Sequence, residues 1–420
     1  MNYMSVTLDK LKNHQNVFLT GGAGVGKTTT TRSIIEAYEA DAKRVAKLAS
    51  TGMAATLIGG QTLHSFFDFG IAADIQELEK NAKFELKKKI KKLILSMDLI
   101  VVDEISMVSD KLFEMIALRL KQAGFRGSLL VVGDFLQLPP VVRGSAEVNF
   151  AFESQAWQKF DFETIELRHV YRTDDKEFIE LLHYIRFGHI DESIHNRLND
   201  FIKPMPHNFS DFTFLFGKNI SATIHNRREL QHIDSELFIK KAQIIKHKKT
   251  LQDKAVERFM QDARIEQELE LKIGAPVLFS RNAWNYFNGE RGVVINIDET
   301  YVYVEKVDGK IVKLEQVAQS KTEWIEKKQK EKSEFVEKDL VTVYQYPIKL
   351  AFAITIHKSQ GMSIENLIIE TNEIFAPSQF YVAISRASNP KRLTLIAPRK
   401  QWYELAYVNP KAMAFVKGSN

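Results

Sequence analysis

Apolar and polar positions in the first third of the chain alternate between two kinds of segment. Stretches with helical periodicity separate short runs rich in β-branched and other apolar residues, which stand at 16–20, 44–49, 99–102 and 129–132. A continuous apolar run of this length is typical of a strand that is buried on both faces. Because these strands alternate with helices, the pattern predicts a parallel α/β sheet.

A second α/β pattern begins near residue 162. It predicts helices at 176–187 and 221–232 and strands at 213–216, 351–358, 366–370 and 392–396. The pattern breaks off after residue 232 and resumes at 351, and 271–346 within that gap has a different character. The fold class that follows is α/β, with two parallel-sheet cores that each carry an insertion.

Both insertions differ in pattern from the cores. In the second core, residues 271–346 contain short β-rich runs and the turn pairs Asn288-Gly289 and Asp308-Gly309, which predict a small β-barrel. Within that stretch, 324–338 is charged and helical in character. In the first core, 74–95 reads as a helical insertion, and its lysines are better explained by a solvated helix face than by contacts to phosphates: Lys83, Lys87, Lys88, Lys89, Lys91 and Lys92.

Composition narrows the class of protein. With 420 residues the chain is too long for one core, and its 45% hydrophobic and 26% charged residues fit a globular protein. No apolar run approaches the roughly 20 residues of a membrane span and the start lacks the pattern of a signal peptide, so we expect a cytoplasmic, or nucleoid-associated, location. The chain has no cysteine, which excludes thiolate chemistry, and its net charge of +5 permits a polyanionic partner without requiring one.

A phosphate-binding loop follows the first predicted strand. Residues 16–30, NVFLTGGAGVGKTTT, place Gly-x4-Gly-Lys-Thr between a strand and a helix, which is the full context of a P-loop. Glycines let backbone N–H groups surround phosphates, Lys27 would contact the β- and γ-phosphates of ATP, and the Thr28 hydroxyl would bind Mg²⁺. The predicted nucleotide-binding residues of the loop are Gly22, Ala23, Gly24, Val25, Gly26, Lys27, Thr28 and Thr29.

An acidic pair ends the third predicted strand, in LIVVDEISM at 99–107. Asp103 would hold the magnesium ion through water, and Glu104 would act as the general base that polarises the attacking water. The alternative is that both carboxylates cap the helix that starts near Ser109. With a P-loop upstream, the pair favours hydrolysis over simple binding of the nucleotide.

Three further side chains distinguish a motor from other P-loop proteins. Gln137, in GDFLQLPP at 133–140, stands where an amide can sense the γ-phosphate. Arg172 and Arg386 lie in the second α/β half, and guanidinium groups from a facing domain stabilise charge on a phosphoryl group in transfer. Either arginine alone is more often a surface ion-pair partner, but the combination favours catalysis.

Several stretches together resemble one family. They are STGMAA with GQTLHSFF (50–67), GDFLQLPPV (133–141), LKIGAPVLFSRN (271–282), NGERGVV (288–294), AITIHKSQGMS (353–363) and YVAISRA (381–387). They resemble the superfamily 1B helicases of the PIF type, which are related to the RecD and Dda helicases. The resemblance implies two RecA-like domains with the ATP cleft between them, at 1–65 with 98–155 and at 156–270 with 347–400. It also implies a wedge insertion at 66–97, an SH3-like insertion at 271–346 and a C-terminal tail at 401–420.

The resemblance also implies roles for individual residues. It makes Lys27, Glu104, Gln137, Arg172 and Arg386 catalytic. It assigns nucleic-acid contacts to Thr51, Gly52, Thr62, His64, Asn282, His357, Lys358, Ser359 and Gln360. For His64 and His357 a hydrogen-bonded structural role stays open, and Phe66, Phe67 and Phe69 are better explained as core than as base-stacking residues.

The activity implied by the resemblance is ATP-dependent 5′-to-3′ translocation on single-stranded DNA by a monomer. Tailed or forked duplex DNA would be unwound, in genome maintenance such as repair, recombination, replication or telomere maintenance. Three alternatives stay open: an RNA-directed helicase of the same chemistry, a translocase that does not unwind, and a non-hydrolysing single-strand binding module that nucleotide switches.

Overall fold

The first parallel sheet carries the P-loop. The computed structural model describes residues 3–51, 54–55, 58–141, 147–206, 211–263, 265–329 and 332–418, with backbone alone at 327–329 and 332–334. The sheet has six strands in the order β3 (Gln61–Thr62), β2 (Val45–Ala49), β4 (Leu99–Asp103), β5 (Ser128–Val132), β1 (Val17–Thr20) and β6 (Glu163–Glu166). All of its strand pairs are parallel, so this half of the predicted fold class is confirmed.

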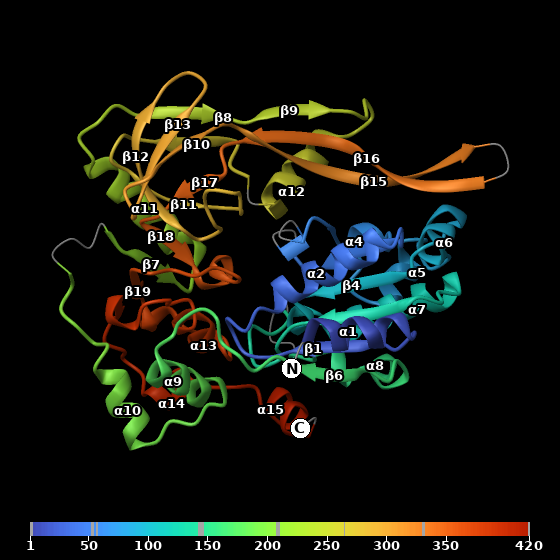
Figure 1. The fold of residues 1–420 in the computed structure, drawn as a ribbon, viewed down its shortest axis with the longest axis horizontal. Helices are drawn as coiled ribbons and strands as arrows, with labels where there is room; N and C mark the ends of the chain where they lie inside the picture. Colours follow the sequence, from blue (N-terminus) through green and yellow to red (C-terminus); the bar gives the residue numbers. More distant parts are fainter. Residues whose placement is uncertain are drawn as a thin grey trace.

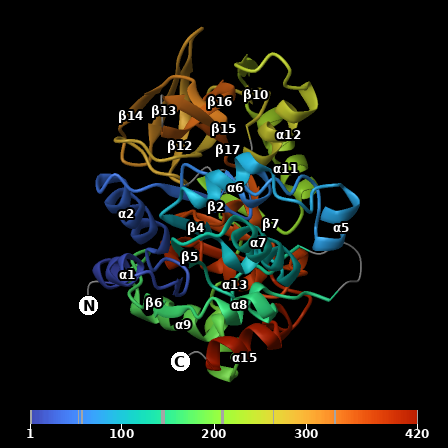
Figure 2. The ribbon, with the colours of Figure 1, turned by 90° about the vertical axis from the view of Figure 1, so that its right-hand side faces the viewer.

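Helices cover both faces of this sheet (Figure 2). Alternate strand residues such as Val101 and Val102 belong to two different hydrophobic clusters, because successive side chains of a strand point to opposite faces. One cluster contains residues of α1 (Tyr3–Lys12) and α2 (Lys27–Ala40). The other contains residues of α4 (Leu63–Phe66), α5 (Ile75–Lys80), α6 (Lys88–Leu95), α7 (Asp110–Ala123) and α8 (Gln155–Lys159).

The predicted wedge region belongs partly to this second cluster. Phe66, Phe67 and Phe69 are buried, with 2%, 0% and 0% of their surface exposed, which confirms the prediction that they are core residues. The charged stretch beyond them folds into α5 and α6. Leu93 and Ile94 of α6 are buried against the same cluster, whereas Lys88, Lys89 and most of the lysines beside them are exposed, as expected of a solvated helix face.

The second parallel sheet is smaller and lies beside the first (Figure 1). It has four strands in the order β18 (Ala353–Thr355), β7 (Thr213–Phe216), β19 (Leu367–Ile369) and β20 (Leu393–Leu395). One face packs against α9 (Lys176–Arg186), α10 (Glu192–Asn199), α13 (Gln379–Ile384) and α14 (Trp402–Leu405), and the other against α11 (Asn219–His232). Both predicted helices of this half are present.

An antiparallel sheet interrupts the second core. Its five strands follow the order β14 (Ile311–Leu314), β13 (Val302–Lys306), β12 (Arg291–Ile297), β11 (Pro276–Phe279) and β17 (Ile348–Leu350). These strands match the predicted β-rich runs, and they enclose a hydrophobic cluster of their own. Residues 238–271 precede this sheet in the chain. They form the strands β8 (Phe238–Lys241) and β9 (Gln243–Lys246), the helix α12 (Asp253–Ala263) and the strand β10 (Glu268–Leu271).

The prediction of a helix at 324–338 is wrong. This stretch belongs to a long antiparallel hairpin of β15 (Val317–Gln329) and β16 (Lys332–Gln345), in which Trp324 pairs with Glu337 and Ile325 with Val336. Its many Lys, Glu and Gln residues have high intrinsic helix propensity, which is why the sequence pattern favours a helix. Tertiary contacts override that propensity, since β16 also pairs with β9 and the hairpin packs against the first domain.

The hairpin reaches from the antiparallel sheet across to the first domain (Figure 1). Phe335 is buried in the first domain's hydrophobic cluster, and Trp324 packs against it. Polar contacts accompany them: the Gln61 side-chain amide donates to Thr322 Oγ1 at 3.1 Å, and Lys92 Nζ lies 2.7 Å from a carboxylate oxygen of Glu326. The hairpin therefore ties the insertion of the second core to the edge of the first sheet.

Three expected segment boundaries need correction. Strand β6, placed at the start of the second core, pairs with β1 in the first sheet; it was missed because this edge strand is largely exposed and lacks an apolar run. Strands β8 and β9 pair with β10 and β16, so part of 156–270 belongs with the β-rich insertion. The expected tail is structured, since α14 packs in the second core and α15 (Pro410–Gly418) packs against the first. In the part of the chain that the structure describes, no helix is long and apolar enough to cross a membrane.

The hairpin register is testable because the chain has no native cysteine. Ser320 and Thr342 are register partners, and their hydroxyl oxygens lie 2.8 Å apart. We predict that Ser320→Cys combined with Thr342→Cys forms a disulfide under mild oxidation, measured by thiol titration, because cross-strand partners have Cβ atoms about 4.5–5.5 Å apart. Ser320→Cys with Tyr344→Cys, two residues out of register, should oxidise much more slowly; equal rates would contradict the register.

Candidate active site

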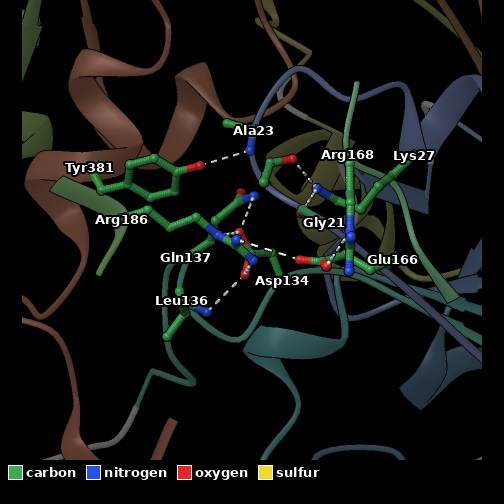
Figure 3. A network of polar contacts seen from close by, with 11 residues as sticks. Gly21, Ala23, Lys27, Asp134, Leu136, Gln137, Glu166, Arg168, Arg186 and Tyr381 are labelled. Atoms are coloured by element: carbon green, nitrogen blue, oxygen red, sulfur yellow. Dashed lines mark hydrogen bonds and ion pairs between the residues drawn. The ribbon is translucent and has the colours of Figure 1, made fainter. Parts of the chain in front are cut away.

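The P-loop connects β1 to α2 and closes around the side chain of Lys27. Gly24 and Gly26 have φ values of 78° and 86°, which favour glycine, and Gly26 stands immediately before the first residue of α2. The Lys27 ammonium donates hydrogen bonds to the carbonyl oxygens of Gly21 at 2.7 Å and Gly22 at 2.8 Å (Figure 3). The loop thus stands between a strand and a helix, as the sequence predicts, and its lysine is turned onto the loop's own carbonyl groups.

The ammonium group of Lys27 is surrounded by charge. Burial lowers its pKa below the ordinary lysine value, and the positive charge of Arg186 acts in the same direction. The carboxylates of Asp134, Glu104 and Asp103 oppose this shift. A partly desolvated ammonium among carboxylates is stabilised by them, so Lys27 and the acidic residues depend on one another.

The acidic pair lies where β4 ends. Asp103 is 7% exposed, and one of its carboxylate oxygens accepts a hydrogen bond from the backbone N–H of Glu104 at 2.8 Å. Burial raises the pKa of Asp103 to about 6, and burial together with the Asp103 charge raises the pKa of Glu104 to about 7. A carboxylate whose pKa lies near neutrality is well matched to accept a proton at that pH.

Neither carboxylate caps the helix that follows. The cap of α7 is Ser109, whose hydroxyl accepts a hydrogen bond from the backbone N–H of Leu112 at 3.2 Å. Glu104 instead has a φ of 53° and a ψ of 49°, in the left-handed region that costs energy for a residue other than glycine. The alternative reading of the pair as helix caps is wrong, which leaves both carboxyl groups facing Lys27.

Asp134 and Arg186 form a buried ion pair between the two halves of the molecule. Arg186, at the end of α9, donates through Nε and Nη2 to the two carboxylate oxygens of Asp134, each at 3.0 Å (Figure 3). Although burial alone would raise the pKa of Asp134, the Arg186 charge and hydrogen bonds hold it below its usual value. Sequence reasoning missed both residues, although Asp134 lies inside the GDFLQLPP motif.

Gln137 is part of the same network. It is 5% exposed, and its side-chain amide lies within 3.4 Å of Asp134 as a donor. Tyr381 of α13 was not predicted: its hydroxyl accepts the backbone N–H of Ala23 in the P-loop at 2.8 Å. Gly22, Ala23 and Val25 also line, with Arg186 and Tyr381, a cavity of about 390 Å³. The P-loop therefore meets α9 and α13 of the second core directly.

The two predicted arginines lie together on the second core. Arg172 donates to the Ser363 hydroxyl at 2.9 Å and to the Ser385 carbonyl at 2.7 Å. It also packs closely against the P-loop, since a Cβ built on Gly24 would lie 2.8 Å from the Cβ of Arg172. Arg386 is 2% exposed, and burial lowers its pKa to about 10 while the Glu104 charge acts in the opposite direction. Burial and the neighbouring Arg386 also lower the pKa of Arg172. The guanidinium group of Arg386 is buried and that of Arg172 is half-buried, and a pair of this kind on one core favours binding of an anion.

Gln360 contacts the acidic pair. Its side-chain amide donates to a carboxylate oxygen of Glu104 at 2.9 Å, and only 9% of the residue is exposed. Gln360 directly follows the short 3₁₀ helix η4 (Ile356–Ser359), in which His357 and Lys358 are half-buried and Ser359 is buried. Of the residues expected to contact nucleic acid, Gln360 thus lies at the candidate catalytic carboxylate.

The other residues expected to contact nucleic acid are distributed over several elements. Thr51 accepts the N–H of Ala54, Thr62 caps α4, and Asn282, which is exposed, accepts the N–H of Asn288; Gly52 lies outside the described residues. Thr62 and His64 line a cavity of about 530 Å³ whose other walls come from α12 and the β15–β16 hairpin. His64 packs edge-on against Phe69, and burial lowers its pKa.

The remaining loop residues of the predicted site, Thr28 and Thr29, begin α2 directly after Lys27. Thr28 is half-buried and Thr29 is exposed. A hydroxyl beside Lys27 and the carboxylate of Asp103 supply only oxygen donors, which fits the preference of Mg²⁺ for oxygen ligands and retained waters. No group of three or more acidic, histidine or cysteine side chains with metal-site geometry occurs within the described ranges.

The fold and this site define a P-loop nucleoside triphosphatase in which residues of two parallel-sheet cores meet at one phosphate-binding loop. A family model described as PIF1-like helicase matches residues 4–196. The chain is 40% identical to the ATP-dependent DNA helicase Pif1 of Campylobacter jejuni, over 96% of this chain and 93% of that protein. The chain belongs to the PIF1-like helicase family, so the resemblance seen in its motifs is confirmed.

Solved structures agree with this assignment. A crystal structure of Bacteroides sp Pif1 in complex with ADP-AlF4 is 25% identical, covers 100% of this chain and 96% of its own, and superimposes with a TM-score of 0.83. A crystal structure of Bacteroides Pif1 bound to ssDNA, also 25% identical and with the same coverage, gives a TM-score of 0.66. The first of the two is therefore the closer match to the arrangement of this chain.

Removal of one partner of the buried ion pair should destabilise the protein strongly. We predict that Arg186→Met lowers the free energy of unfolding by about 3–5 kcal/mol, because it leaves the Asp134 carboxylate buried without its counter-charge. Adding Asp134→Asn removes that charge but keeps an amide oxygen for the N–H of Leu136, so the double variant should recover part of the loss. Urea unfolding followed by circular dichroism measures both; a double variant no more stable than Arg186→Met would contradict this role.

Proposed function

We propose that this protein is an ATP-dependent DNA helicase that translocates along single-stranded DNA in the 5′-to-3′ direction. The observation that carries the proposal is the hydrogen bond from Gln360 to Glu104, because it joins the candidate general base of one core to the nucleic-acid motif of the other. The relatives described above are named as ATP-dependent DNA helicases, and one of the solved structures holds ssDNA. The direction rests on the superfamily 1B motifs.

Hydrolysis would use residues from both cores. Lys27, which donates to two P-loop carbonyls, would exchange these bonds for the β- and γ-phosphates of ATP. Glu104 would accept the proton of the attacking water, with its pKa already raised by burial. Arg172 and Arg386 would stabilise the charge that develops on the γ-phosphoryl group, and Gln137 would report its presence to the Asp134–Arg186 pair.

Thr28 and Asp103 are the residues that would hold Mg²⁺, Asp103 through a water molecule. When bound, this ion neutralises charge on the phosphate oxygens. The side chains of this chain would place it: the Thr28 hydroxyl at the start of α2 and the Asp103 carboxylate at the end of β4. A raised pKa of Asp103 implies that ion binding weakens as the pH falls through about 6, because protonation removes the negative charge that would attract the ion and its bound water.

Movement along DNA would follow from two grips that belong to different cores. Thr51, Thr62 and His64 stand on the first core, and His357 and Lys358 on the second. If ATP draws the cores together and hydrolysis releases them, grips that alternate in strength move the strand in one direction. The α5–α6 segment would separate the duplex ahead. Every residue of this scheme belongs to one chain, which supports activity as a monomer.

Duplexes with a single-stranded tail test the proposal. We predict ATP-dependent strand separation from a 5′ tail and not from a 3′ tail. Glu104→Gln should bind ATP but lose hydrolysis by roughly 10²- to 10⁴-fold, because the amide cannot accept the proton. Lys27→Ala serves as the blank. Unwinding from the 3′ tail would contradict the direction, hydrolysis without unwinding would favour a translocase, and stronger stimulation by RNA than by DNA would favour an RNA-directed helicase.

A further inference from the structure

Two large aromatic side chains on the β-rich insertion are exposed and take no part in the site described above. Trp284 is 94% exposed and Phe287 is 65% exposed, and both belong to the loop at 280–290 that joins β11 to β12. The chain has four tryptophans, and the others are sheltered: Trp157 and Trp402 are 8% and 2% exposed, and Trp324 is half-buried. An indole ring left in water contributes almost nothing to the core.

The loop holds Trp284 on a small, well-fixed turn. Ala283 and Tyr286 form an isolated antiparallel bridge, with the N–H of Ala283 donating to the Tyr286 carbonyl at 2.8 Å, so Trp284 occupies the tip between them. The Tyr286 ring is buried and stacks on Phe279 with centroids 4.4 Å apart. A side chain on a fixed turn loses little further backbone freedom when a ligand binds to it.

The far end of the loop is fixed as well. Asn282 accepts the N–H of Asn288 at 2.7 Å, and a carboxylate oxygen of Glu290 accepts the N–H of Phe287 at 3.0 Å. The second oxygen of Glu290 accepts a hydrogen bond from Lys306 at 2.9 Å. The loop that carries both aromatic rings is thus hydrogen-bonded across its base, and neither ring is needed to hold it.

The loop lies against the second core at the segment that follows Gln360. A Cβ built on Gly289 would lie 3.0 Å from the Met362 Cβ and 3.1 Å from the Ser363 carbonyl oxygen, which shows how closely the two segments pack. Ser363 in turn accepts a hydrogen bond from Arg172 of the candidate active site. The exposed rings therefore stand on a loop in direct contact with the segment that joins the nucleic-acid motif to the phosphate-facing arginines.

We propose that Trp284 is a base-stacking platform for single-stranded DNA, with Phe287 as a second contact on the same loop. Aromatic rings beside a path of phosphate contacts bind single strands by stacking on successive bases, and this stacking tolerates any sequence because every base has a flat π-face. The proposal rests on the proposed function, because it assumes that the strand passes the segment after Gln360. Trp284 would thereby add a contact to the bases of the DNA strand, whereas the other residues of the nucleic-acid motif suit contacts to its sugar-phosphate backbone.

Tryptophan fluorescence tests the platform directly. Saturating oligo(dT) should quench the emission of the wild type and shield it from acrylamide, because Trp284 is the tryptophan exposed to solvent. Trp284→Ala should lower the affinity for a labelled oligo(dT), measured by anisotropy, by about 5- to 150-fold, the effect of losing one stacked base. The slope of log affinity against log salt should stay unchanged, because stacking releases no counterions.

Matched variants separate the outcomes. Trp284→Phe should keep most of the affinity and lose the quenching, and Tyr403→Ala, which removes a ring 64% exposed on α14, should change neither. Wild-type affinity in Trp284→Ala, with no quenching in the wild type, would overturn the platform while leaving the helicase proposal intact. A wild type that binds no oligo(dT) would instead overturn the proposed function. Wild-type DNA affinity in Trp284→Ala together with loss of a protein contact would assign the ring to a protein partner and contradict the platform.

Discussion

The ammonium of the half-buried Lys27 is the constraint on which the rest of this structure depends. A charge removed from water is tolerated only when opposite charges and hydrogen-bond acceptors replace the solvent. Here the acceptors are two P-loop carbonyls, and the opposite charges are Asp103, Glu104 and Asp134. Asp134 is in turn matched by Arg186, which comes from the other core. The charge balance of the phosphate-binding loop therefore requires both parallel sheets to be present and packed together.

The same packing explains how the site connects to surfaces far from the nucleotide. Gln360 holds a carboxylate oxygen of Glu104, and Arg172 reaches the hydroxyl of Ser363. Between them runs a single segment that follows β18 and packs against the loop carrying Trp284. These contacts form a continuous path of hydrogen bonds and close packing from the candidate general base, Glu104, to the loop that carries an exposed aromatic ring.

Sequence alone was sufficient for features that local chemistry determines. The buried strands β1, β2, β4 and β5 are predicted by their apolar runs. The P-loop is predicted by its glycines, its lysine and its position between a strand and a helix. Contacts between residues far apart in the chain could not be predicted from the sequence. Asp134 and Arg186 are 52 residues apart and Ala23 and Tyr381 are 358 apart, so no spacing rule links them. The hydrogen bond from Gln360 to Glu104 joins residues 256 positions apart, so the expectation of a nucleic-acid contact at Gln360 could not include it. The prediction for residues 324–338 was wrong for a different reason. The composition of the β15–β16 hairpin favours a helix, and it is the pairing with β9 and the packing on the first core that stabilise the strands.

The central claim is that catalysis in the first core is completed by an arginine from the second. The most direct measurement is steady-state ATP hydrolysis by Arg386→Ala at saturating single-stranded DNA, compared with ATP binding by the same variant. The account predicts that ATP affinity stays within a few-fold of the wild type while turnover falls by roughly 10³-fold or more, as when a catalytic arginine is withdrawn from a phosphoryl group. Turnover equal to that of the wild type, in a variant that binds ATP normally, would contradict it.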